Sequence, residues 1–409
     1  MTARLTARPP DERLVDRLLG PAEHALRARV RAVVDEHVAP RAAEADRTAA
    51  FAGDSYQALA GAGLAGLLFP AQYGGQDAST LGYAMAMEEI ACACGATSLI
   101  YMTQTHAGYP ILLAGTEEQR RRFLPGLCTG RSYGSLAITE PSAGSDAAAL
   151  RTRARREDDG YVLDGAKTFI TTGDRADVIV CFATVDRGAG RDGITVFVIP
   201  GDAPGLTRGR VLRKMGMHGS STAELFFDGV RLPADARLGP ERGGWELLTR
   251  SVVKSRISAA AQGIGLARGA YAAAVGWAKR SGVLDRDGDQ RGQFKLAELR
   301  SRVLTGRLLL YGAAAAVDED GRGEELDADV SMMKLTCTNL GMAVATEVAE
   351  LLGPRGDLAE SQAERYLRDA KVTQIYDGTN EVQRLLIARD IARGAGEGDG
   401  VAAVSGGHA

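Results

Sequence analysis

The chain has 409 residues, enough for two or three structural units rather than a single core. Hydrophobic residues make up 45% and charged residues 25%, values typical of a packed globular protein. The net charge of −3 gives no reason to expect nucleic acid or a membrane surface as a partner. No segment offers about 18 uncharged apolar residues, so no membrane span is expected.

Residues 1–20 carry charges and lack an apolar core, so they do not resemble a secretion signal. The five cysteines form neither a CxxC motif nor a disulfide framework, and we therefore expect a reducing, cytoplasmic setting. The five histidines are scattered without a metal-ligand spacing, so no metal site is predicted.

Three regions differ in composition and in hydrophobic pattern. Residues 20–130 are rich in Ala, Leu and Arg and predict an N-terminal helical domain. Residues 131–240 contain short β-branched and aromatic runs bounded by Gly, Asp and Pro, too closely spaced for helical crossovers, so we expect an antiparallel β-domain. Residues 241–395 return to long Ala-rich helices, and residues 396–409 are expected to be a disordered tail. The predicted fold class is therefore α+β, with several domains.

One motif is misleading. The stretch GAGLAG at residues 61–66 matches the GxGxxG pattern of dinucleotide-binding proteins, but that pattern requires a preceding strand. The preceding DSYQALA predicts a helix instead. We therefore interpret these glycines as the end of a helix.

Four other motifs carry the functional signal. AITEPSAGSD follows a predicted strand and offers hydroxyls and unhindered backbone N–H groups, which suit a phosphate or the edge of a flavin. Alone, this motif is also compatible with a polar turn. Three further motifs follow it in the chain: KTFITTGDRADV (167–178), KMGMHGSSTAELFFDGVRLP (214–233) and IYDGTNEVQR (375–384). In the last motif a carboxylate precedes a glycine and a threonine that can begin a helix.

These four motifs in this order resemble the acyl-CoA dehydrogenase family over roughly residues 25–392. The resemblance implies an N-terminal helical domain, a middle β-barrel-like domain and a C-terminal four-helix bundle. It implies FAD between the β-domain and the bundle, with further contacts from a neighbouring subunit. It also implies a homotetramer or a homodimer.

The resemblance assigns residues of this chain to the flavin. Thr139 would contact the isoalloxazine, Phe169 would stack on it, and Thr171 would reach N5. Ser145 would contact the pyrophosphate or the substrate. The residues implied near the FAD phosphates are Thr379 and Glu381.

The resemblance also assigns residues to the substrate. Asp377 falls where many members carry a catalytic Glu, and would remove the α-proton of an acyl thioester while a hydride leaves the β-carbon for flavin N5. Arg256 would lie near the acyl-CoA and the base, and Gly378 would offer a backbone contact to the thioester. Tyr376 would influence the depth of the acyl pocket. Burial would raise the pKa of Asp377 and the following helix start would lower it, and the sequence leaves the balance open.

Several positions depart from the family pattern. Asp377 is one methylene shorter than Glu, and a displacement of about 1 Å can reduce a rate on the order of 100-fold. Ser255 stands where some members carry an alternative base, and Val253 replaces a common Asp on the CoA side. Lys279 replaces the Arg of an RxxFG stretch, and Glu350 replaces a Gln that helps bind FAD. We therefore expect FAD binding that is weaker or differently arranged at the adenine end.

Three functions remain open at this point. The first is a flavin dehydrogenase of an acyl thioester, carried by CoA or by a carrier protein, in fatty-acid, branched-chain or biosynthetic (polyketide-type) metabolism. Its electron acceptor would be an electron-transfer flavoprotein. The second is a flavin oxidase or N-oxygenase that uses O2, since relatives resembling nitroalkane oxidase use Asp at this position. The third is a non-redox thioester-binding protein without flavin.

Overall fold

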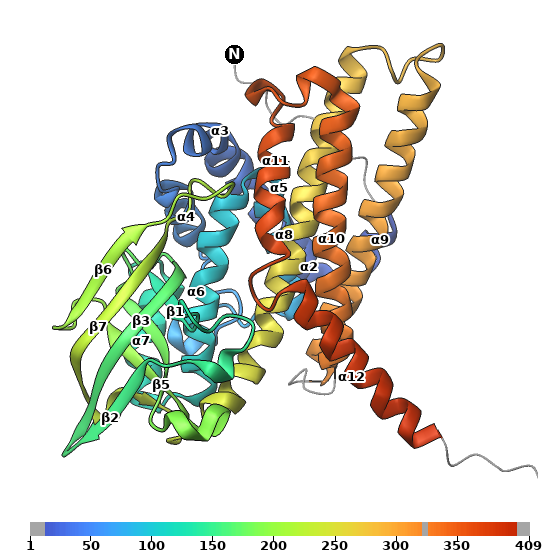
Figure 1. Cartoon of the computed structure of the whole chain (residues 1–409). Coiled ribbons are helices and arrows are strands. Elements are labelled where there is room, and N and C mark those ends of the chain that lie inside the picture. The colour runs from blue at the N-terminus through green and yellow to red at the C-terminus, as the bar shows by residue number, and fades with distance from the viewer. Residues whose placement is uncertain (1–12, 321–325, 399–409) are drawn as a thin grey trace, which may run out of the picture.

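The computed structural model describes residues 13–320 and 326–398. A helical region comes first, a β-sheet follows, and long helices complete the chain, as the sequence predicted. In Figure 1 the long helices stand beside the sheet, and α6 lies between the two. None of the described helices is long and apolar enough to cross a membrane.

The N-terminal region is built around two buried helices, α5 and α6. The Ser79 hydroxyl accepts a hydrogen bond from the Gly82 amide and caps α5, and Cys94 caps α6 in the same way through the Thr97 amide. Nearly every residue of both helices is buried, which explains why neither has a polar face. The elements are α1 (Arg13–Asp16), α2 (Pro21–Val33), a π-helical turn (Val34–Val38), α3 (Ala39–Thr48), α4 (Gly53–Gly61), α5 (Thr80–Ala93), α6 (Gly95–Ala114) and α7 (Glu117–Cys128).

The middle region forms one eight-stranded sheet with the order β6-β7-β3-β2-β4-β5-β8, and β1 pairs with β4. Most neighbouring strands are antiparallel, as predicted. The β1–β4 and β2–β4 pairs are parallel, which strand spacing did not predict, because other strands lie between the paired strands in the chain. The strands are β1 (Gly134–Ala137), β2 (Arg153–Glu157), β3 (Gly160–Thr171), β4 (Val178–Thr184), β5 (Ile194–Pro200), β6 (Leu206–Val211), β7 (Thr222–Pro233) and β8 (Arg237–Leu238).

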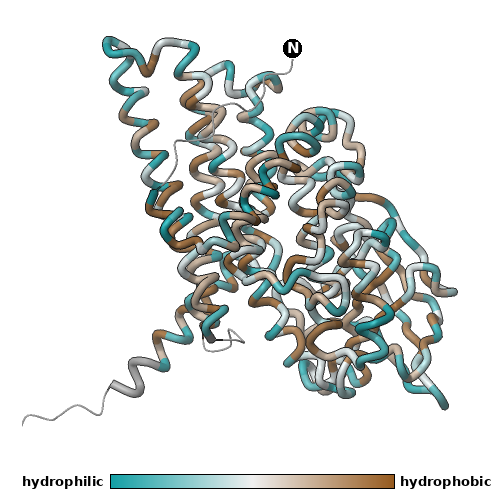
Figure 2. Tube along the Cα trace, turned by 180° about the vertical axis from the view of Figure 1, so that it is seen from behind, coloured by the Kyte–Doolittle hydropathy of each residue, from teal (hydrophilic) through white to brown (hydrophobic). Residues whose placement is uncertain are grey.

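The C-terminal region packs two of its long helices, α8 and α10, at close range. A Cβ atom on Gly341 would lie 2.6 Å from the carbonyl oxygen of Gly263, so glycine is what allows this approach. Hydrophobic residues run along the helices that face one another, and polar residues lie outside (Figure 2). The helices are α8 (Gly244–Arg280), α9 (Gln290–Asp320), α10 (Asp327–Leu352), α11 (Ala363–Thr373) and α12 (Asn380–Gly398), of which α12 projects from the bundle (Figure 1).

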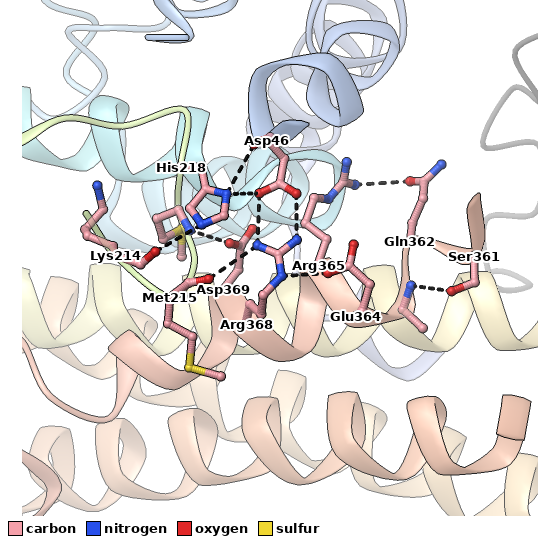
Figure 3. Close-up of polar contacts among 12 residues, drawn as sticks. Asp46, Lys214, Met215, His218, Ser361, Gln362, Glu364, Arg365, Arg368 and Asp369 are labelled. Carbon is pink, nitrogen blue, oxygen red and sulfur yellow. Dashed lines mark hydrogen bonds and ion pairs between the residues drawn. The ribbon is translucent and has the colours of Figure 1, made fainter. Parts of the chain in front are cut away.

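A cluster of ion pairs joins the three regions (Figure 3). Arg368 on α11 donates to both carboxylate oxygens of Asp46 on α3, at 3.1 and 2.6 Å. His218, between β6 and β7, lies with Nδ1 3.1 Å from the same carboxylate. The neighbouring Asp369 accepts a hydrogen bond from the Met217 amide. Segments from the N-terminal, middle and C-terminal regions of the chain are therefore held together at one point.

Two predictions about chain segments concern helix ends. Helix α4 ends at Gly61 and Gly63 takes a φ of +72°, so the glycines of GAGLAG do end a helix. The tail was expected to begin at residue 396, but α12 continues to Gly398. The rest of the predicted tail, residues 399–409, lies outside the described residues.

Candidate active site

Asp377 lies on the turn between α11 and α12, with a φ of +55°. Aspartate tolerates this left-handed conformation better than most residues, and Gly378 continues it with a φ of +83°. The Gly378 carbonyl oxygen accepts hydrogen bonds from Lys334 Nζ and Gln383 Nε2, both at 2.9 Å. Lys334 Nζ also donates to Asn380 Oδ1 at 2.9 Å. One buried ammonium therefore fixes both ends of the turn that presents the carboxylate.

The Asp377 carboxylate is largely enclosed. Its side chain is 14% exposed, and Oδ2 has no hydrogen-bond partner among the described residues. Burial raises the pKa of Asp377, and the nearby His106, Lys334 and Arg256 oppose that rise without cancelling it. Burial is therefore the largest influence on this pKa, and it prevails over the neighbouring charges. A raised pKa makes this carboxylate a stronger base than an exposed aspartate.

Arg256 and Tyr376 reach the same place from different elements. Arg256 on α8 is buried, and its guanidinium pairs with the carboxylate of Asp327 at the start of α10. Its charge is close enough to act on the pKa of Asp377. The Tyr376 hydroxyl lies 4.0 Å from the sulfur of Met102 on α6, and its ring packs against the main apolar core. The structure therefore places both residues beside the predicted base.

A bulge in β3 turns Phe169 out of the sheet. The register between β3 and β7 shifts between Lys167 and Ile170, and Phe169 takes a φ of +57°. An aromatic residue rarely adopts this conformation, and strain of this kind is typical of functional sites. The Phe169 side chain is nevertheless 65% exposed, so core packing does not explain it. An exposed ring on a strained backbone fits a flat ligand that stacks on it.

The loop after β1 is fastened to this bulge. The Thr139 carbonyl oxygen accepts a hydrogen bond from the Thr168 amide at 2.9 Å. Glu140 accepts from the Thr152 amide at 2.9 Å and pairs with Lys167 Nζ at 2.8 Å. Glu140 and Lys167 are both buried. This buried ion pair holds Thr139 in place, and the sequence analysis did not identify either member.

The other residues assigned to FAD lie at exposed or half-exposed positions. Thr171 ends β3 just past the bulge, and Ser145 is exposed in the loop after β1. Thr379 precedes α12, where its hydroxyl accepts from the Val382 amide at 3.3 Å, and Glu381 is exposed in the first turn. Hydroxyls and backbone N–H groups suit phosphate, and the bulge suits a planar ring. The residues present therefore fit FAD.

Lys279 lies far from Arg256 within one chain. It is exposed in the last turn of α8, 23 residues after Arg256 on the same helix. A rise of 1.5 Å per residue separates the two by roughly 35 Å.

Helix α6 connects Asp377 with the start of β1, and sequence reasoning missed its part in the candidate site. Gln104 Oε1 accepts from the Gly134 amide at 2.7 Å and so anchors the start of β1. His106 Nδ1 lies 3.8 Å from Asp377 Oδ1. A lone histidine in an apolar helix has no spacing signal, and Lys334 in α10 is equally inconspicuous. The available clue was a polar side chain inside an otherwise buried helix.

Lys334 is the second titratable group of the site. Burial lowers its pKa to about 8, and the charge of Asp377 opposes that shift. In the part of the chain that the structure describes, no group of three or more His, Cys, Asp or Glu is placed to hold a metal ion. The titratable chemistry of this site therefore rests on Asp377, Lys334 and His106.

Comparison with known proteins agrees with this architecture. The N-terminal, middle and C-terminal domain models of acyl-CoA dehydrogenases match residues 20–131, 135–230 and 242–392. An acyl-CoA dehydrogenase of Bacillus subtilis is 37% identical over 372 residues, which cover 90% of this chain and 97% of that protein. The chain belongs to the acyl-CoA dehydrogenase family, a family of FAD-dependent oxidoreductases. This confirms the predicted family and the predicted three-part fold.

Two solved structures illustrate the range of this fold. A glutaryl-CoA dehydrogenase from Mycobacterium smegmatis in complex with FADH2 matches with a TM-score of 0.86 and 29% identity, covering 92% of this chain and 96% of that chain. A prolyl acyl carrier protein oxidase matches with a TM-score of 0.84 and 30% identity, covering 91% and 99%. The overall structure of this chain is therefore about equally similar to that of a dehydrogenase and to that of an oxidase.

Proposed function

We propose that this protein catalyses the FAD-dependent α,β-dehydrogenation of an acyl thioester, with Asp377 as the base that removes the α-proton. The observation that carries the proposal is the Asp377 carboxylate itself. It is enclosed, its Oδ2 has no partner among the described residues, and burial raises its pKa. A carboxylate in this state is poised to accept a proton.

The other residues of the site support this step. Removing an α-proton places negative charge on the thioester oxygen, which requires hydrogen-bond donors. Among the described residues no hydrogen bond uses the backbone N–H of Asp377, so this N–H is free to bind that oxygen. Lys334 holds the turn in place, and Arg256 and Lys334 lower the free energy of the ionised base. FAD, when bound, accepts the hydride that leaves the β-carbon.

We propose that the FAD is held by the bulge and its neighbouring loop. Phe169 would stack on the ring system, with Thr139 and Thr171 at its edge. Ser145, Thr379 and Glu381 would lie near the phosphates. The exposed position of Lys279, far from Arg256, favours a contact with the FAD of a neighbouring subunit, in a homotetramer or a homodimer.

Anaerobic titration of the purified protein with a panel of acyl-CoA thioesters tests this function. The protein should be yellow, with about one FAD per subunit, and a suitable acyl-CoA should bleach the flavin and yield the trans-2-enoyl thioester. A colourless protein, or a yellow protein that no thioester bleaches, would contradict the proposal. The colourless outcome would favour a non-redox thioester-binding protein.

A second candidate function is a flavin oxidase, acting on a carrier-protein thioester or as a nitroalkane-oxidase-like enzyme. Two observations favour it: Asp377 is shorter than the Glu common in dehydrogenases, and a prolyl acyl carrier protein oxidase has a similar structure. The electron acceptor separates the two functions. Reduced flavin that is reoxidised rapidly by O2 indicates an oxidase, whereas slow reoxidation, accelerated by an electron-transfer flavoprotein, indicates a dehydrogenase.

A further inference from the structure

The Asp377 carboxylate faces an imidazole across the site. His106 Nδ1, on α6, lies 3.8 Å from Asp377 Oδ1, on the turn before α12. The exposed fractions of the two side chains are 8% and 14%. Residues 271 positions apart in the chain are therefore enclosed together, and no described group lies closer to this carboxylate oxygen within hydrogen-bond or ion-pair distance.

Neither group is satisfied in this arrangement. A separation of 3.8 Å is longer than a hydrogen bond, and among the described residues His106 Nε2 and Asp377 Oδ2 have no partner. Nearly all buried polar atoms in proteins are paired, and each unpaired one costs about 1–3 kcal/mol. Two such atoms on facing side chains lower the stability of the folded protein, so a structural role does not explain them. They are expected where a bound reactant completes the arrangement.

The proton on the imidazole has one favourable position. Burial lowers the pKa of His106, and the Asp377 charge opposes this without reversing it, so the ring is neutral at neutral pH. A neutral ring carries one proton. On Nδ1 the proton faces the carboxylate, whereas on Nε2 it would leave an unpaired N–H and turn a lone pair toward negative charge. The Nδ1–H tautomer is therefore favoured.

The other charged groups around Asp377 already have partners. Lys334 on α10 donates to Gly378 O and Asn380 Oδ1, and Arg256 on α8 pairs with Asp327. The Tyr83 hydroxyl on α5 lies 2.9 Å from Ser258 Oγ. The titratable or charged groups that act on the carboxylate or lie beside it are His106, Lys334, Arg256, Tyr83 and Tyr376. Arg256 Nε also has no partner among the described residues, but Arg256 is held by Asp327, and of these groups only His106 lies within ion-pair distance of the carboxylate.

We propose that His106 is a positioning residue for the base. When the acyl thioester binds, the Nδ1–H of His106 donates a hydrogen bond to Asp377 Oδ1 and directs Oδ2 toward the α-carbon. A movement of roughly 0.8 Å brings the two atoms to the usual length of about 3.0 Å. The inference rests on the proposed role of Asp377 as the base. A hydrogen bond from a neutral donor favours the ionised carboxylate, so His106 also keeps Asp377 ionised at lower pH.

Three variants at one position test this proposal. In His106→Asn the amide nitrogen lies near the place of Nδ1, in His106→Gln it lies near the place of Nε2, and His106→Leu has no donor. The anaerobic rate of flavin bleaching is measured by stopped flow across pH, using an acyl-CoA that bleaches the unmodified protein. Flavin content and Tm are recorded for each variant.

His106→Leu should bleach about 10- to 100-fold more slowly, with substrate affinity changed less than about 3-fold and the acid limb moved to higher pH. His106→Asn should recover most of the rate, and His106→Gln should behave like the Leu variant. If the Leu variant does not fold, the Gln variant serves as the variant lacking a donor at Nδ1. A Leu or Gln variant with the normal rate and pH profile would overturn the inference, as would an Asn variant as slow as the Leu variant. An unmodified protein that no thioester bleaches would instead overturn the proposed function, and the inference with it.

Discussion

At the scale of single residues, the site concentrates unfavourable features around Asp377. The residue has a left-handed backbone, an enclosed carboxylate and an oxygen without a described partner. Each of these features opposes stability, and burial raises the pKa of the carboxyl group. A buried base that is costly to ionise is a strong proton acceptor, so the same features that weaken the fold favour the chemistry.

The pH dependence of flavin reduction should be bell-shaped. The rate should rise with pH as Asp377 loses its proton, with a midpoint above the ordinary aspartate value of about 3.9. It should fall above about pH 8, as Lys334 becomes neutral and no longer supports the ionised base. Stopped-flow measurement of bleaching from about pH 3.5 to about pH 10 checks both limbs. An acid midpoint at the ordinary aspartate value would show that burial does not tune this group.

Asp377→Asn should stabilise the protein at neutral pH. A carboxyl pKa raised by folding means that the native state loses stability as pH rises through that pKa, and asparagine cannot ionise. Removing an enclosed charge with an unpaired oxygen should contribute roughly 1–3 kcal/mol. The variant should therefore have a higher Tm than the unmodified protein at pH 8, and the difference should shrink as the pH falls through the raised pKa. An equal or lower Tm at pH 8 would contradict this expectation.

At the scale of elements, β3 and α5 each carry an unusual residue, and the two residues have different surroundings. Strand β3 carries a bulge that exposes an aromatic ring, whereas α5 carries a buried carboxylate deep in the helical core. Glu88 Oε1 lies 2.6 Å from Arg268 Nη1 on α8 and 2.6 Å from Arg307 Nε on α9, and Oε2 accepts from the Tyr311 hydroxyl at 2.6 Å. We propose that the first feature serves ligand binding, whereas the second joins three helices.

Phe169→Ala should weaken FAD binding with little effect on stability. The ring is mostly exposed, so its loss removes little core packing, while a lost aromatic stack is worth about 0.5–1.5 kcal/mol. The Kd for FAD should rise about 2- to 10-fold and the Tm of the flavin-free protein should stay the same. Phe226→Ala, on β7 of the same sheet, is the matched control and should leave FAD affinity unchanged. If the Phe169→Ala variant bound FAD as tightly as the unmodified protein, the bulge would not be part of the FAD site.

Glu88→Gln should destabilise the protein by about 3–5 kcal/mol. The substitution leaves the two buried guanidinium groups of Arg268 and Arg307 without the carboxylate that they share. Chemical denaturation followed by circular dichroism measures the change. Glu44→Gln removes an exposed pair with Arg47 and should leave the midpoint unchanged. If both variants unfold at the same denaturant concentration, the buried cluster does not stabilise the core.

At the scale of the whole molecule, the three regions meet at α6 and at the Asp46–Arg368 contact (Figure 3). The sequence predicted these regions because periodicity changes from helical to strand-like and back, and it predicted Asp377 because its motif is local. It did not predict the β1–β4 pairing, which joins segments separated by a hairpin. It also missed His106 and Lys334, since their importance arises only when α6 and α10 pack against the turn at Asp377.

The most direct test of the account is the single-turnover rate of anaerobic flavin bleaching in Asp377→Asn, compared with the unmodified protein and the same acyl-CoA. Asparagine has nearly the same shape but cannot accept the α-proton, so the variant should fold, retain FAD and bind the thioester. Its bleaching should be slower by about 100-fold or more. Bleaching at the normal rate would show that Asp377 is not the base.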